Sequence, residues 1–152
     1  MQVLPTTAQV QIVQESFAKV TPIAEAAAAI FYQRLFELDP SLELLFRGDM
    51  KQQGRKLMAM IAAAVRGLDN LSLLVPAVEN LGRRHVNYGV SIKDYDTVGA
   101  ALLWTLGQGL GASFTPVVAE AWSVVYGVLA NTMIAAVERG ASADRSHASP
   151  AA

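Results

Sequence analysis

The chain has 152 residues, enough for one domain with a sizeable core, and 53% of its residues are hydrophobic while only 16% are charged. Its net charge of −1 and the lack of a long basic run argue against a nucleic-acid partner, and a sequence without cysteine excludes disulfides, thiol catalysis and thiolate zinc sites. No basic stretch followed by an apolar one opens the sequence, so we expect no signal peptide and a cytoplasmic location.

The pattern of caps and apolar residues predicts helices throughout. Most of the predicted helices begin at a capping residue such as Thr6, Asp49 or Ser91, or at a proline. In chain order the predicted helices span about 7–20, 22–38, 40–46, 49–67, 71–88, 91–110 and 116–139. No segment alternates with period two, so no sheet is expected. The sequence predicts an all-α fold of seven to eight helices.

The domain organisation is predicted to be simple. Residues 1–140 form one domain, and residues 141–152, rich in Ala and Ser without an apolar period, form a disordered tail that contains His147. Residues 117–137 approach the length of a membrane span, but Glu120, Ser123 and Asn131 interrupt them. We expect a buried central helix there and no membrane partner.

One histidine stands on an apolar helix face. Leu74, Val78, Leu81, His85 and Tyr88 follow helical spacing, so His85 points where the leucines point. An imidazole buried without a partner costs about 1–3 kcal/mol. His85 is therefore a core histidine bonded to a carbonyl, a cation at a helix C-terminus, or a ligand.

Two more polar residues lead or join apolar stripes on other helices. Gln53 heads the stripe that continues at Leu57, and Tyr32 lies between apolar residues at i−4 and i+4. Each has an ordinary explanation, as a boundary residue or a core tyrosine bonded to a carbonyl. Together with His85 they suit a buried cofactor that needs one imidazole, which is too few ligands for zinc but enough for haem iron.

With these residues in place, the sequence resembles the bacterial single-domain globins, the globin domain of flavohaemoglobins and Vitreoscilla-type haemoglobin. The resemblance runs from about residue 7 to 137 and is carried by "FYQRLFELDPSLELLF", "QGRKLM", "NLGRRHVNYGV", "YDTVGAALLWTL" and "AWSVVYGVLANTMI" in that order. It implies a globin fold around a haem b pocket.

The resemblance assigns roles by position. His85 matches the proximal histidine that binds iron, and Tyr32 and Gln53 match the distal pair that hydrogen-bonds the ligand. The other matched positions contact the haem or its proximal side: Phe46, Lys56 at a propionate, Leu57 and Tyr95. In flavohaemoglobins a glutamate bonds the tyrosine at this last position. Here that glutamate position falls at Val137, with Glu138 beside it, which puts strong redox tuning in doubt.

The resemblance implies a haem protein that reversibly binds dioxygen and other diatomic gases for storage or delivery. The alternative is a nitric oxide dioxygenase that takes electrons from an external reductase. A ligand sensor and a haem-free helical interaction module are further alternatives. A monomer or weak homodimer is expected, since no specific seam for association appears in the sequence.

Overall fold

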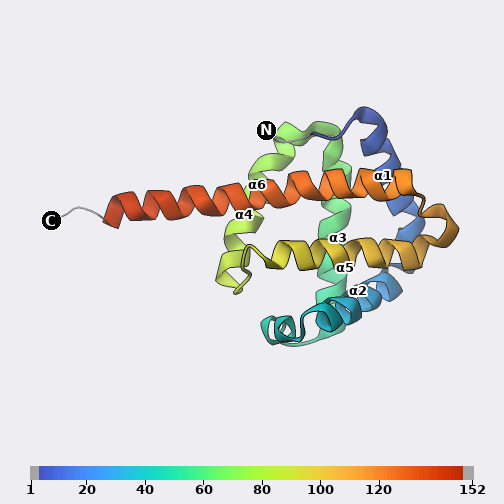
Figure 1. Ribbon diagram of the computed structural model, residues 1–152, viewed down its shortest axis with the longest axis horizontal. Helices are drawn as coiled ribbons and strands as arrows, with labels where there is room; N and C mark the ends of the chain where they lie inside the picture. Colours follow the sequence, from blue (N-terminus) through green and yellow to red (C-terminus); the bar gives the residue numbers. More distant parts are fainter. Residues whose placement is uncertain (1–3, 149–152) are drawn as a thin grey trace.

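The computed structural model describes residues 4–148, with side chains described up to residue 140. Every regular element in this part of the chain is helical, which confirms the all-α prediction. The six α-helices, drawn in Figure 1, are α1 (Thr7–Val20), α2 (Ala24–Leu38), α3 (Met50–Gly67), α4 (Leu71–Asn87), α5 (Asp94–Leu110) and α6 (Pro116–Ala148). Four short 3₁₀ helices connect them: η1 (Thr21–Ile23), η2 (Pro40–Leu45), η3 (Leu68–Asn70) and η4 (Gly111–Ser113).

The number of α-helices within residues 4–148 is slightly lower than predicted. The third predicted helix is the six-residue 3₁₀ helix η2, which starts at Pro40 and is followed by Gly48 with φ of 92°. Six residues are too few for a stable α-helix, and a glycine in the left-handed region ends the helical path.

The last helix is longer than predicted. α6 continues as a helix through Ala148, and Figure 1 shows it extending well past the other helices. Alanine has the highest helix propensity, and extending an existing helix avoids the cost of nucleation. The rest of the predicted tail lies outside the described residues, and the domain limit at residue 140 stays a prediction.

The cap signals at Thr6 and Asp49 act as expected, whereas α5 begins at Asp94 without a side-chain cap from Ser91. Thr6 accepts from the backbone N–H of Gln9, whose side chain accepts in turn from the Thr6 N–H, forming a capping box. Asp49 caps α3 by accepting from Lys51 N at 2.9 Å. These caps fix where α1 and α3 begin, so the apolar stripes enter the core in the predicted register.

The main core lies among α1, α3, α5 and α6. Val13, Phe17, Leu106 and Val125 are buried there around Trp122, whose Nε1 donates to Ser16 Oγ at 2.8 Å. Burying this indole satisfies its one polar group, so the core keeps the full benefit of its apolar area. By length and composition alone, Met50–Asn87 and Pro116–Gly140 could cross a membrane, a test that core helices of soluble proteins also pass.

Two glycines allow close helix packing, one against a side chain and one against backbone. A Cβ at Gly54 would lie 2.9 Å from Ala28 Cβ, so α3 lies directly against α2. A Cβ at Gly82 would lie 2.8 Å from Met133 Cα, so α4 lies directly against α6. These contacts set the positions of the two helices that carry Gln53 and His85.

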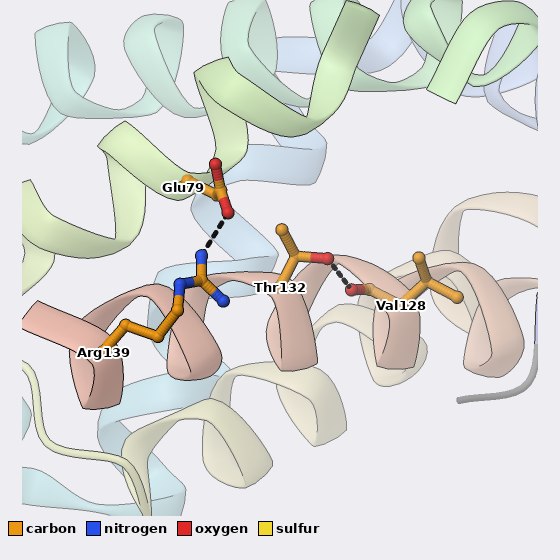
Figure 2. A network of polar contacts seen from close by, with 4 residues as sticks. All are labelled: Glu79, Val128, Thr132 and Arg139. Carbon is orange, nitrogen blue, oxygen red and sulfur yellow. Dashed lines mark hydrogen bonds and ion pairs between the residues drawn. The ribbon is translucent and has the colours of Figure 1, made fainter. Parts of the chain in front are cut away.

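Polar contacts accompany the crossing of α4 and α6. In Figure 2, Arg139 on α6 donates to Glu79 on α4, while Thr132 Oγ1 donates to Val128 O within α6 at 2.8 Å. The ion pair is partly exposed, so it contributes at most about 1 kcal/mol. The backbone contact at Gly82 is the main constraint on this crossing.

Candidate functional site

The histidine occupies the last turn of α4. His85 is half-buried, and its Nδ1 lies 3.3 Å from Tyr95 Oη. Burial, and then the neighbouring Arg84 guanidinium, lower the pKa of His85, so the imidazole is neutral near pH 7. Its Nε2 makes no hydrogen bond to any described residue. If Nδ1–H donates to Tyr95, the lone pair of Nε2 is available for a metal.

Tyr95, the partner of His85, is held at the start of α5. The Ser91 N–H donates to the Asp94 carboxylate at 2.8 Å, and Tyr126 Oη donates to Tyr95 O at 2.6 Å. Burial raises the pKa of Tyr95, which therefore stays a neutral phenol. A neutral phenol is a weaker acceptor for the imidazole N–H than a carboxylate.

The structure also settles the position expected to lack a glutamate. Val137 is half-buried, and the adjacent Glu138 points into solvent with no hydrogen bond to a described residue. Glu138 therefore does not replace the missing carboxylate. Tyr95 contacts His85 directly.

On α2, Tyr32 presents a buried hydroxyl to the start of α3. The residue is 7% exposed, and burial raises its pKa to about 12, so it remains protonated and able to donate. Its hydroxyl donates to Gln53 O at 3.4 Å. This distance exceeds the 2.5–3.0 Å typical of O–H···O bonds, so the hydroxyl gives up little when it turns to another acceptor.

The structure brings Gln53 to Tyr32 through its backbone rather than its amide. Gln53 Nε2 donates to Arg47 O at 3.3 Å, toward the segment that precedes α3. The residue lies one turn after the Asp49 cap, where loop carbonyls are within reach of a long side chain. The expected pair therefore shares one place, but only the tyrosine hydroxyl is buried inside it.

The remaining predicted contacts divide into buried and exposed positions. The rings of Phe46 and Tyr32 meet edge to face with centroids 5.1 Å apart, and Leu57 packs in the same cluster with Val98 and Leu102 of α5. Lys56 is exposed and makes no ion pair with a described residue. Its proposed partner would have to be a bound group.

Two features join the histidine side to the tyrosine side. α5 carries Tyr95 beside His85 and, one turn later, Val98 beside the Tyr32 cluster. A Cβ at Gly89 would lie 3.0 Å from Leu45 Cδ2, so the turn after α4 lies against the end of η2. The predicted positions therefore form two groups linked through α5: His85 with Tyr95, and Tyr32 with Phe46, Leu57 and the Gln53 backbone.

An apolar cavity of about 20 Å³ adjoins this region. Leu57 and Ile61 of α3 line it together with Phe31 and Met58. A cavity of this size holds one molecule of about the volume of water. Its apolar lining offers no hydrogen-bond partner to a diatomic gas. Met58 also lines a groove of about 530 Å³ between α2 and α3 that includes Tyr32.

Sequence reasoning missed Tyr126, which fixes the backbone of Tyr95. Burial raises the pKa of Tyr126 above its usual range, with Tyr95 and Asp96 adding to the effect. Trp122, Tyr126 and Ala130 follow i, i+4 spacing in α6, a stripe that places the tyrosine on the inward face. That stripe was the available signal.

Comparison with known proteins agrees with this geometry. Residues 29–133 match the globin family, and the chain belongs to it. It is 34% identical over 128 residues to a flavohemoprotein of Rhodopirellula baltica, covering 82% of this chain and 31% of that protein. A flavohemoprotein of Vibrio cholerae is 32% identical over 132 residues, covering 85% and 34%. The chain spans about a third of the length of these relatives.

A solved structure is also similar. It is an engineered carbene transferase from Rhodothermus marinus, described as a "putative nitric oxide dioxygenase", with a TM-score of 0.80 and 26% identity over 93% of this chain and 99% of that one. The chain is therefore a globin domain related to flavohemoproteins, and this kinship implies a haem cofactor.

The residues present fit that cofactor. Within the described part of the chain, no three His, Cys, Asp or Glu side chains gather where they could hold a bare metal ion. A single neutral imidazole with a free Nε2 suits a metal whose other ligands come with a porphyrin. The buried tyrosine hydroxyl across the site suits a ligand with a lone pair.

Proposed function

We propose that this chain is a haem b globin that reversibly binds dioxygen and other diatomic gases at ferrous iron, and that it stores or delivers them in the cytoplasm. The observation that carries the proposal is the buried Tyr32 hydroxyl, kept protonated and held only by a 3.4 Å bond. A donor in an apolar surrounding is worth more than one in water, because no solvent competes for the acceptor.

His85 is the proposed proximal ligand. The haem, when bound, would supply a ferrous iron that can bind a gas. His85 Nε2, on α4, would hold this iron, and Tyr95 would fix the ring by accepting from Nδ1–H. Because the acceptor is a neutral phenol rather than a carboxylate, His85 stays a moderate electron donor, which favours reversible binding over redox turnover.

Phe46, Leu57 and Tyr32 form the proposed distal wall. The first two are apolar and would exclude water, while Tyr32 would donate a hydrogen bond to a polar gas ligand. Gln53 adds a second donor if its amide leaves Arg47 O, a bond long enough at 3.3 Å to break readily. Lys56 is available for a haem propionate at the edge of the site.

The second candidate is nitric oxide dioxygenase activity, favoured by the similarity to the Rhodothermus marinus structure and to flavohemoproteins. In that reaction nitric oxide, dioxygen and one electron from an external reductase give nitrate. The same side chains serve both functions, so the rate of re-reduction separates them.

The deciding experiment is the visible spectrum of the purified protein, reduced under argon, exposed to oxygen and then to nitric oxide. A Soret band and an oxygenated form stable for minutes support gas binding. Oxidation within seconds of adding nitric oxide, followed by rapid recovery with a reductase, supports the dioxygenase. If added haem produces no Soret band, the proposal is wrong.

A further inference from the structure

The charges of this chain are distributed very unevenly. Residues 47–93, which contain α3 and α4, carry eight basic and three acidic residues, while the rest of the chain carries four basic and ten acidic ones. The near-neutral total therefore hides a strongly positive part and a strongly negative part. α3 and α4 are the two helices on either side of the candidate haem site.

All eight basic side chains on this segment are exposed. They form what we name the basic surface: Arg47, Lys51, Arg55, Lys56, Arg66, Arg83, Arg84 and Lys93. Among the described residues none of them has an ion pair or a side-chain hydrogen bond. The haem propionates can neutralise only two of these charges.

The three acidic residues of the segment are already engaged. Asp49 caps α3, Asp69 accepts from Gln14 Nε2 at 3.0 Å, and Glu79 pairs with Arg139. With eight cations against three carboxylates, the segment still carries a net charge of +5.

Apolar side chains are exposed on the same helices. Met60 on α3 and Val86 and Tyr88 at the end of α4 are 37%, 48% and 60% exposed. Aromatic, Met and Arg side chains are enriched at protein interfaces, with apolar contacts inside and charges at the rim. At 1.5 Å per residue α3 is about 27 Å long, a dimension suited to a standard interface.

We infer that the basic surface docks an acidic protein that delivers single electrons to the haem, of the kind that carries a flavin or an iron–sulfur cluster. This inference rests on the proposed function, because a haem that becomes ferric must be reduced before it binds dioxygen again. The electron passes from the reduced donor to ferric iron, with no bond made or broken in the protein. Docking across α3 and α4 places the donor beside the helices that hold the haem. A lipid surface or a nucleic acid meets the charge but has no electron to give.

The test uses the ferric holoprotein and reduced flavodoxin, an acidic flavin protein, as the probe. The second-order rate of haem reduction is followed by stopped flow between 20 and 500 mM NaCl. Arg55→Glu on α3 and Arg83→Glu on α4 are compared with Lys19→Glu, an equal charge reversal at an exposed position of α1 outside the basic surface. Neither reversed arginine is among the residues proposed to hold the haem or the gas.

We expect each arginine reversal to slow reduction about 5- to 10-fold at low salt, and Lys19→Glu less than 2-fold, because steering depends on where the charge lies. The differences should disappear at 500 mM NaCl, where the Debye length is less than about 5 Å and charges on the two proteins are screened from each other. Rates independent of salt, or equal slowing by Lys19→Glu, would overturn the inference. So would salt-insensitive reduction together with sedimentation on phosphatidylglycerol vesicles that Arg55→Glu abolishes, since that result assigns the surface to a membrane. If the variants keep their Soret bands and bind oxygen, the proposed function holds and a negative result concerns the docking surface alone.

Discussion

Replacing Tyr32 with phenylalanine tests the distal side of the site most directly. The substitution removes one oxygen atom and leaves the ring that packs on Phe46 and Phe36. The lost bond to Gln53 O is 3.4 Å long, so the free energy of unfolding should change by less than about 1 kcal/mol. The effect on a bound gas should be larger.

The magnitude follows from what the hydroxyl exchanges. A hydrogen bond to a partly charged acceptor is worth about 1.5–3 kcal/mol, and the weak bond given up is worth about 0.5 kcal/mol. The net of about 1–2.5 kcal/mol corresponds to about 5- to 70-fold in affinity, expressed mainly in the dissociation rate. Carbon monoxide carries little charge on its outer atom and should be released at nearly the same rate as from the unchanged protein.

Stopped-flow displacement of oxygen and of carbon monoxide measures both rates. Tyr88→Phe is the matched control, because it removes the same atom from a tyrosine that is 60% exposed. Equal acceleration of both gases in Tyr32→Phe, or no acceleration of oxygen release, refutes the role of the hydroxyl. Slower binding of both gases with unchanged release would instead indicate that Tyr32 controls access.

Three further outcomes are expected. Tyr95→Phe should speed haem loss to apomyoglobin about 10-fold and lower the iron–histidine stretching frequency, because His85 Nδ1 loses its partner; an unchanged frequency would contradict this role. Gly82→Ala should destabilise the protein by about 1–3 kcal/mol in thermal unfolding, whereas Gly127→Ala, where a Cβ meets nothing within 4 Å, should be neutral or stabilising. In the haem-free protein, burial and then Arg84 lower the pKa of His85. Below pH about 6.5 the unfolded chain therefore binds more protons than the folded one, and the unfolding free energy should fall as the pH drops toward the lowered pKa. The unfolding free energy of His85→Phe should depend less on pH over that window.

The helices were predictable because their signals are local. The Thr6 capping box, the Asp49 cap and the prolines at residues 22, 40 and 116 lie within a turn of the boundaries that the structure shows. The end of α6 could not be predicted, because whether a helix of Ala and Ser frays or continues depends on small differences in helix propensity. The short η2 was placed correctly but given the wrong helical type.

The candidate site was only partly readable from the sequence. Helical spacing predicted that His85, Tyr32 and Leu57 face inward, and the resemblance assigned their roles. Spacing could not foresee that the Gln53 amide turns to Arg47 O, because a long side chain at a helix start reaches several acceptors.

The replacement of a missing carboxylate by direct contact with Tyr95 was equally hidden. That contact joins two helices, and its length depends on how α4 and α5 pack rather than on either segment alone.

The contact between Gly82 and Met133 restricts how this chain can change over evolution. Because main chain touches main chain there, sliding α4 along α6 by one residue would force Leu81 or Arg83 into a space that holds no side chain. An insertion or deletion between Gly82 and His85 would rotate the imidazole by about 100° per residue while the crossing stayed fixed. The three-residue interval from Gly82 to His85 is therefore expected to keep its length among relatives, while the side chains around the gas site can vary. Insertions are expected in the surface loops instead.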